Sequence, residues 1–162
     1  MRKKIVWVTG AKGSLGSEIC ERLPKDVYEL VKTDREVDVA DRQAVSSFAE
    51  KVGPDAVINC AGLREETMGE KGTIRLYQVN TLPATDYGKS KLAGERFVQN
   101  LNPDHLIVRS SWVYGKKGDN FLTYILKMAE DTQFLSVPND QISTPTSAGE
   151  LANFVIQMIG SS

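Results

Sequence analysis

Short runs of apolar, mostly β-branched residues alternate along the chain with segments in which apolar side chains recur every three or four positions. The short runs are typical of buried strands, which we expect at residues 5–9, 27–31, 56–60 and 105–109. The periodic segments predict helices at residues 15–23, 42–52, 89–100, 121–129 and 149–159. Because strands alternate with helices, the pattern favours an α/β fold with a doubly wound parallel sheet.

Capping and breaking residues mark the ends of several of these elements. Asp41 is an expected N-cap for the second helix, which Gly53 and Pro54 should end, and Ser147 is an expected cap for the last helix. Two weaker signals remain. They predict a short extended piece at residues 37–39 and a further helix at residues 74–80.

Composition narrows the class of protein. The chain has 162 residues, a net charge of -1 and 41% hydrophobic side chains, as ordinary globular proteins have. It contains no apolar run of the ~18 residues that a membrane span needs, and no signal-peptide pattern follows its basic start. Its near-neutral charge gives no basic surface for nucleic acid. Cys20 and Cys60 are too few for a disulfide framework or a metal knuckle. We therefore expect a cytoplasmic protein without metal, membrane or nucleic-acid partners.

Three glycines, Gly10, Gly13 and Gly16, form the pattern G-x-x-G-x-x-G directly between the first strand and the first helix. Glycine allows a turn with positive φ and a close approach of the backbone to a ligand. The helix that follows offers free amides and a positive dipole end to a diphosphate. Asp34 ends the next strand, where an acid accepts hydrogen bonds from a ribose diol. The spacing predicts a dinucleotide site, with a plain strand–helix turn as the alternative.

Arg35, the residue after Asp34, leaves the choice of cofactor open. A basic side chain in this place can meet the 2′-phosphate that distinguishes NADPH from NADH. It can equally be a solvated surface arginine.

Tyr87 and Lys91 stand four residues apart, which places both on one face of a helix. An ammonium group beside a phenol favours the phenolate, so such a pair can act as a general acid or base near neutral pH. The spacing alone is common by chance, and it gains weight here because it follows a glycine loop.

Several further segments match one family in order along the chain. They are NCAG at 59–62, Asn80, YGKSKLAGE at 87–95, RSSWVYG at 109–115, NF at 120–121 and NDQISTPT at 139–146. With them, the chain resembles the dTDP-4-dehydrorhamnose reductases, in the extended branch of the short-chain dehydrogenase/reductase superfamily. The resemblance implies a Rossmann-like cofactor domain at residues 1–109 and an incomplete small substrate-binding lobe at residues 110–162.

The resemblance also implies an activity. It is the reduction of the 4-keto group of dTDP-4-dehydro-L-rhamnose to dTDP-L-rhamnose, with NADPH or NADH as the cofactor. The nucleotide sugar would be the ligand of the substrate lobe, and a homodimer is the expected assembly.

Roles for single residues follow from the same resemblance. Tyr87 would protonate the developing alkoxide, while Lys91 would lower the pKa of Tyr87 and hold the nicotinamide ribose. The other cofactor-binding residues would be Gly10, Gly13, Ser14, Leu15, Gly16, Asp34, Arg35, Asp38, Val39, Cys60, Ala61, Gly62 and Asn80. The sugar side would be shaped by Trp112, Val113, Asn120, Gln141, Pro145 and Thr146. Simpler interpretations stay open, with Trp112 as a core aromatic and Cys60 as a small buried hydrophobe.

The chain departs from the family between Asn80 and Tyr87, where the family has a helix, a strand and a catalytic Ser or Thr. Only six residues stand there, and they span ~20 Å at most when extended. Thr85 is the remaining candidate for the third catalytic group. The missing strand would lie inside the sheet, so its loss leaves two strand edges without partners. Three explanations are open: ordered residues numbered without gaps, a shortened form of the protein, or a strand supplied by a partner subunit.

Because of this short segment, two alternative functions stay open. One is a non-catalytic, dinucleotide-binding regulatory subunit with the same fold, for which the missing Ser or Thr speaks. The other is a different nucleotide-sugar enzyme, an epimerase or a dehydratase. Retention of Tyr87 and Lys91 favours a reductase over the regulatory subunit.

Overall fold

A computed structural model of the chain describes residues 2–62, 86–137 and 143–161. The chain divides into two compact units, of which the first joins Met1–Ala61 with Ser110–Ser162 and the second is Gly62–Arg109. These bounds differ from the expected division at residue 109, because the C-terminal helix packs on the first helix of the chain. The expected division concerns where cofactor and substrate bind, and it stays a prediction.

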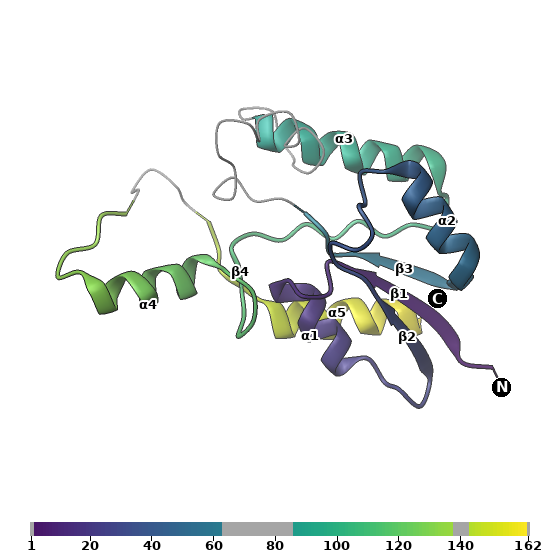
Figure 1. Cartoon of the computed structure of the whole chain (residues 1–162), viewed down its shortest axis with the longest axis horizontal. Coiled ribbons are helices and arrows are strands. Elements are labelled where there is room, and N and C mark those ends of the chain that lie inside the picture. Colours follow the sequence, from purple (N-terminus) through teal and green to yellow (C-terminus); the bar gives the residue numbers. More distant parts are fainter. Residues whose placement is uncertain (1, 63–85, 138–142, 162) are drawn as a thin grey trace. The chain divides into compact units, whose positions relative to one another are not determined.

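The first unit is built on a three-stranded parallel sheet (Figure 1). β1 (Lys4–Thr9) lies in the middle, with β2 (Tyr28–Lys32) on one side and β3 (Ala56–Asn59) on the other. The register places Val6 opposite Ala56 of β3. Each strand begins and ends within one residue of its expected position, so these three strand predictions are confirmed.

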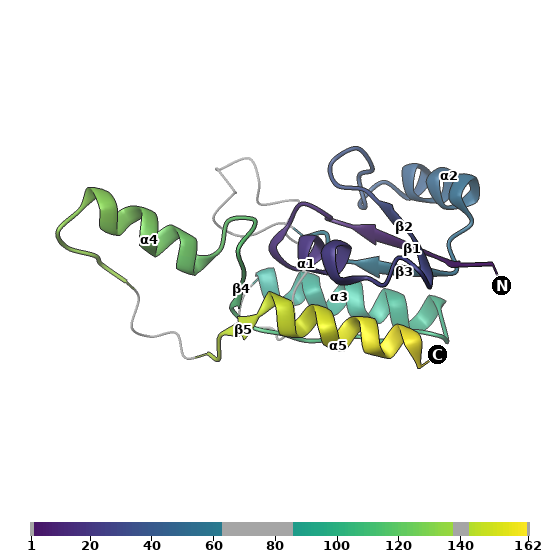
Figure 2. The ribbon, with the colours of Figure 1, turned by 90° about the horizontal axis from the view of Figure 1, so that it is seen from below.

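One face of the sheet is covered by two helices, α1 (Ser14–Arg22) and α5 (Ala148–Gly160) (Figure 2). Val6 and Val8 of β1 point to this face and are fully buried, together with Ile19 of α1. Burial of an aliphatic side chain of this size stabilises the fold by ~1.5–3 kcal/mol. The apolar face of α1, read from its helical spacing, therefore faces the core as predicted.

The opposite face of the sheet is covered by α2 (Arg42–Val52) (Figure 2). Side chains alternate between the two faces of a strand, so Trp7 points away from the valines beside it. The Trp7 and Phe48 rings lie 4.8 Å apart between centroids, and Trp7 Nε1 donates a 2.9 Å hydrogen bond to Thr33 Oγ1. Helices on both faces of a parallel sheet confirm the doubly wound α/β fold.

The predicted caps stand where the helices begin and end. Asp41 Oδ1 accepts hydrogen bonds from the amides of Gln43 and Ala44 at the start of α2. Gly53 ends the same helix in the left-handed conformation, with φ +61°. Ser147 Oγ accepts from an amide in the first turn of α5.

The remainder of the first unit is a small parallel ladder and one helix. β4 (Val113–Tyr114) pairs with β5 (Thr146–Ser147), and α4 (Phe121–Asp131) occupies the stretch between them. A capping box starts α4, because the Asn120 side chain accepts from the Thr123 amide while the Thr123 hydroxyl accepts from the Asn120 amide. The helix predicted at residues 121–129 is confirmed.

The second unit contains α3 (Asp86–Leu101), which confirms and extends the helix predicted at residues 89–100. Within the described residues, neither α3 nor any other helix is long and apolar enough to cross a membrane. The strand predicted at residues 105–109 is wrong, because this segment has no strand conformation. A strand needs a hydrogen-bonded neighbour, and among the described residues no strand pairs with it. Arg109 is instead held by two hydrogen bonds to Glu95, of 3.0 and 2.7 Å.

The extended piece predicted at residues 37–39 is also wrong, because Val37 lies in a bend and Val39 in a turn. Asp38 explains the difference. Its carboxylate accepts from the Ala40 amide and its carbonyl accepts from the Asp41 amide, and these local bonds fold the backbone back. The helix predicted at residues 74–80 lies outside the described residues.

Candidate functional site

Gly10, Gly13 and Gly16 form the tight turn that leads from β1 into α1. Gly10 has φ +62°, and a Cβ at this position would lie 2.7 Å from the backbone nitrogen of Ala61. A Cβ on Gly16 would overlap the carbonyl oxygen of Gly10. No side chain fits either place, so the spacing of the glycines follows from the close packing of the loop.

The amides at the start of α1 form the anion-binding end of this loop. Gly13 is the N-cap of α1, and no side chain caps the amides of the first turn. The Gly13 amide donates to the Gly10 carbonyl at 3.0 Å, which holds the turn closed. Helix amides without a cap, at the positive end of a helix dipole, suit a negatively charged ligand. The loop therefore fits the diphosphate of a dinucleotide. Ser14 and Leu15 begin α1, and their contacts with the cofactor stay predictions.

A second loop, residues 115–119, lies against the same helix start. Gly118 has φ +71°, and a Cβ there would lie 2.8 Å from the Ser14 nitrogen. Lys117 of this loop forms an ion pair with Glu21 of α1. The sequence analysis did not predict that this loop lies against α1. The signal that could have indicated it is the pair of glycines at 115 and 118, because glycine allows a close backbone approach.

Asn120 holds this second loop in shape. It is buried, and its side-chain nitrogen donates to the carbonyl oxygens of Gly115 and Gly118 at 3.0 and 3.3 Å. Its side-chain oxygen caps α4. The structure therefore gives Asn120 a local role, and its expected contact with the nucleotide sugar stays a prediction.

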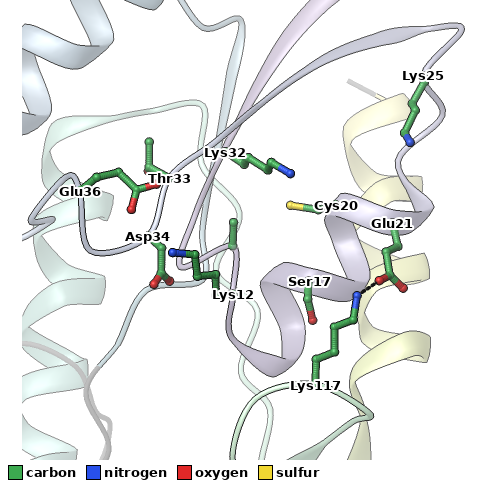
Figure 3. A pocket seen from close by; sticks show the side chains of 11 residues that line it. Lys12, Ser17, Cys20, Glu21, Lys25, Lys32, Thr33, Asp34, Glu36 and Lys117 are labelled. Carbon is green, nitrogen blue, oxygen red and sulfur yellow. Dashed lines mark hydrogen bonds and ion pairs between the residues drawn. The ribbon is translucent and has the colours of Figure 1, made fainter.

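An open cavity of about 460 Å³ lies between α1 and the carboxyl end of β2 (Figure 3). The Ala11 amide donates to the Thr33 carbonyl at 3.0 Å, which joins the glycine loop to the end of β2. Asp34 and Lys12 follow these two residues and both line the cavity. The position of Asp34 suits the predicted acid that accepts hydrogen bonds from a ribose diol.

The other residues expected near the adenosine lie in an exposed turn. Arg35 is exposed and does not line the cavity. Asp38 and Val39 are exposed too, and the Asp38 carboxylate is used by the Ala40 amide. Their contacts with the cofactor stay predictions.

The segment after β3 forms the wall behind Gly10. Backbone atoms of Cys60 and Ala61 lie 2.7–2.8 Å from the position that a Cβ on Gly10 would take. Gly62 follows them and is exposed. Cys60 packs against the core, and burial raises the pKa of its thiol to about 12. A protonated, packed thiol agrees with the interpretation of Cys60 as a small hydrophobe.

Two of the segments expected at the sugar side are brought together. Val113 of β4 pairs with Thr146 of β5, and the Thr146 amide donates to the Trp112 carbonyl at 3.2 Å. The Ser111 hydroxyl adds a 2.8 Å hydrogen bond to a carbonyl of the second segment. Pro145, beside Thr146, is exposed. These segments are separated by thirty residues in sequence, so only the fold makes them neighbours.

Trp112 is 43% exposed, which excludes its interpretation as a core aromatic. Its φ is +44°, a left-handed conformation that bulky residues seldom adopt. Its ring packs on the ring of Phe121 with centroids 5.4 Å apart. A strained backbone under an exposed aromatic ring agrees with the predicted contact of Trp112 with the sugar, which stays a prediction.

The expected acid–base pair lies on α3, in the second unit. Tyr87 and Lys91 are both in the helix, so their predicted helical spacing is confirmed. Lys91 is partly buried, and this burial lowers the pKa of its ammonium to about 8. The Tyr87 side chain, like Thr85, lies outside what the structure describes. Two further expected site residues share this status: Asn80 and Gln141.

Metal-binding side chains do not gather in the described ranges, where no group of three or more His, Cys, Asp or Glu residues can hold an ion. His105 is the single histidine of the sequence. Its Nδ1 lies 2.6 Å from the Asn102 carbonyl, in an exposed turn.

Solved structures share this fold. A dTDP-4-dehydrorhamnose reductase from Clostridium acetobutylicum superimposes with a TM-score of 0.82 at 29% identity, over 97% of this chain and 70% of that one. The dTDP-4-dehydrorhamnose reductase from Bacillus anthracis, solved in complex with NADP, gives 0.86 at 26% identity, over 99% of this chain and 72% of that one.

A relative in Bacillus subtilis, the spore coat polysaccharide biosynthesis protein SpsK, is 32% identical over 94% of this chain and 69% of its own length. The dTDP-4-dehydrorhamnose reductase of Aggregatibacter actinomycetemcomitans is 28% identical over 93% of this chain and 66% of its own length. The chain thus spans about two thirds of these relatives. The SpsK alignment spans 194 positions and includes 94% of the 162 residues here, about 152, so about 42 positions, 194 minus 152, have no residue in this chain.

One protein family matches almost the whole chain. Its model, described as the RmlD substrate binding domain, covers residues 3–82 and 68–162 in two overlapping stretches. The resemblance to dTDP-4-dehydrorhamnose reductases is thereby confirmed. The chain belongs to the RmlD substrate binding domain family.

Proposed function

We propose that this protein reduces the 4-keto group of dTDP-4-dehydro-L-rhamnose to give dTDP-L-rhamnose. The observation that carries the proposal is the match to proteins named dTDP-4-dehydrorhamnose reductase, which reaches 93% of this chain in one relative and 98% in another. We take NADPH or NADH as the cofactor, because the similar Bacillus anthracis structure is a complex with NADP. The proposal includes a cytoplasmic location and a homodimer, to be checked by cell fractionation and by sedimentation.

The glycine loop supports the cofactor part of this proposal. Gly10 and Gly16 leave no room for side chains, and this packing holds the loop tightly at the start of α1. Ser14 and Leu15 place their amides at the positive end of α1. Asp34 lines the adjoining cavity, where its carboxylate can accept from ribose hydroxyls. The bound cofactor supplies the hydride that reduces the sugar ketone.

Tyr87 and Lys91 support the chemical part. In this proposal the Tyr87 hydroxyl donates its proton to the sugar oxygen as negative charge develops on it. Lys91 keeps its ammonium charge below about pH 8, and a nearby positive charge makes the phenol a stronger acid. The same ammonium can donate to a hydroxyl of the nicotinamide ribose.

Trp112 and the ladder of β4 and β5 support the sugar part. The exposed face of Trp112 offers an apolar surface beside the polar backbone of two short strands. Aromatic faces combined with a few fixed polar groups are usual in sites for small ligands. Val113 and Thr146 face each other in this ladder, and we place the sugar against them.

One observation favours a different function, that of a non-catalytic subunit that binds the dinucleotide. About 42 aligned positions of SpsK, 194 minus 94% of 162, have no residue here, and the resemblance places the family's catalytic Ser or Thr in a segment that is short in this chain. A non-catalytic subunit that binds the dinucleotide would need the glycine loop and Asp34 but not Tyr87.

The test is turnover of dTDP-4-dehydro-L-rhamnose by the full chain, followed as loss of the reduced-nicotinamide absorbance. Wild type should consume NADPH only when the sugar is present. Tyr87→Phe should lose turnover and keep cofactor binding measured by calorimetry. Tyr124→Phe removes a hydroxyl from an exposed position on α4 and is the matched control, which should stay active.

Three results would count against the proposal. Full activity of Tyr87→Phe would remove the role given to that phenol. Cofactor binding without turnover by wild type would favour the non-catalytic subunit. Absence of cofactor binding would contradict both functions.

A further inference from the structure

β3 forms one edge of the three-stranded sheet, and in the part of the chain that the structure describes no strand pairs with its outer side (Figure 1). The Asp55 amide donates to the Ile5 carbonyl of β1 at 2.8 Å. Backbone groups point alternately to the two sides of a strand, so the amides and carbonyls of Ala56 and Ile58 point away from β1. Such a row of donors and acceptors is the surface to which a further extended strand binds.

The side chains of β3 suit an apolar neighbour at this edge. Ala56 and Ile58 pack against the core, whereas Val57 lies on the opposite face and is 54% exposed. A valine within a parallel strand is usually covered. Edge strands that avoid association carry charged residues or proline, and the sequence of β3, Ala-Val-Ile-Asn, contains neither. The edge is therefore open to a further strand in both its backbone and its side chains.

Residues 105–109 are the matching feature, an apolar run that has the composition of a strand and no strand as a neighbour among the described residues. Leu106 is 59% exposed and Val108 is 37% exposed. In an extended segment these two side chains point to the same face, and Ile107 points to the other. The run thus presents to solvent the side chains that a strand in a sheet would bury.

The edge of β3 and the run at 105–109 complement each other. Both are uncharged between their ends, so no charge opposes their contact. In the structure no ladder joins them within one chain. Each copy of the chain therefore carries an open edge together with a strand-like segment that has no place in a sheet. A second copy supplies what each of these features lacks, and no other molecule is needed.

We propose that the outer edge of β3 binds residues 105–109 of a second copy of this chain as an added strand, and that the exchange is reciprocal. The backbone groups of Ala56 and Ile58 then gain partners, and Leu106 and Val108 lie on the same face of the extended sheet as Val57. The inference rests on the homodimer included in the proposed function, and it goes further by assigning the surface that forms it.

The first test is sedimentation equilibrium of the full chain over a range of concentrations. Leu106→Lys places a charge in the added strand and should weaken the dimer at least about tenfold, because an apolar contact is lost from both copies. Leu101→Lys is the matched control, since Leu101 is 80% exposed at the end of α3, outside the run. It should leave the dimer unchanged. Both leucines are exposed in the single chain, so neither substitution should change urea unfolding of the dissociated protein.

Val57→Lys makes the same test from the accepting edge, and it also serves if Leu106→Lys does not fold. It should weaken the dimer at least about tenfold as well.

The second test, amide hydrogen exchange, locates the contact. The amides of Ala56 and Ile58 and those of residues 106–108 should be protected in the dimer. After dilution to the monomer they should exchange at least about tenfold faster. Equal protection in the monomer would indicate pairing within one chain and would overturn the inference.

Other results also overturn it. They are a dimer that Leu106→Lys and Val57→Lys leave intact, and a dimer that Leu101→Lys weakens as much as they do. A wild type that is monomeric at all concentrations and still turns over the sugar would remove the homodimer and this interface but leave the proposed reaction. A dimer with the expected sensitivity and no turnover would contradict the proposed reaction alone.

Discussion

Two glycines of the first unit share one backbone conformation and differ in their surroundings. Gly10 and Gly53 have φ of +62° and +61°. A Cβ on Gly10 would meet backbone atoms of Ala61 and Cys60 at 2.7–2.8 Å, whereas a Cβ on Gly53 would meet nothing within 4 Å. Substitution of each by alanine therefore separates backbone strain from steric contact.

The expected magnitudes follow from these surroundings. Alanine in the left-handed conformation costs about 1–2 kcal/mol, and the loss of unfolded-state freedom offsets about 0.4–1 kcal/mol of it. Gly53→Ala should therefore destabilise the protein by roughly 1 kcal/mol or less. Gly10→Ala carries the same strain and adds an overpacking cost of about 1–3 kcal/mol, because backbone atoms cannot move aside as a flexible side chain does.

The assay is equilibrium unfolding in urea, with the free energy taken from midpoint and slope. Gly10→Ala should be less stable than Gly53→Ala by about 1–3 kcal/mol, with unchanged slopes. Equal destabilisation by the two substitutions would refute the reasoning. It would mean that the glycine loop does not pack on the end of β3 as the distances state.

The other predictions concern a cap, the core and the ammonium of Lys91. Asp41→Ala removes the acceptor of two amides of α2 and should cost about 1 kcal/mol in urea unfolding; an unchanged midpoint would contradict the cap. Ile19→Ala empties a fully buried site and should cost about 2–5 kcal/mol, while a loss below 1 kcal/mol would place Ile19 outside the core. Turnover should fall as pH rises through about 8, where Lys91 loses its proton. Lys91→Arg stays charged and should shift this fall to higher pH; a fall that stays in place would assign it to another group.

Local signals in the sequence predicted the parts of the fold that local chemistry determines. The glycine turn, the Asp41 and Ser147 caps and the Gly53 stop all depend on residues within a few positions of one another. The central strand β1 was found from its apolar run, because a strand covered on both faces is apolar there.

Longer-range contacts explain what the sequence did not predict. The apolar segment at residues 105–109 has the composition of a strand, but strand formation depends on a neighbour that composition does not reveal. The place of Lys12 beside Asp34 follows from one hydrogen bond between β-strand ends, and the contact of Gly118 with Ser14 joins segments about a hundred residues apart. Such contacts become visible only when the chain is folded.

The two tryptophans of the chain differ in their access to solvent and can be distinguished by fluorescence quenching. Trp7 is 1% exposed between the sheet and α2, whereas Trp112 is 43% exposed. A collisional quencher such as acrylamide should reach Trp112 and leave the emission of Trp7 almost unchanged. Trp7 then reports on the intact core, and Trp112 reports on whatever molecule comes to rest on its exposed ring.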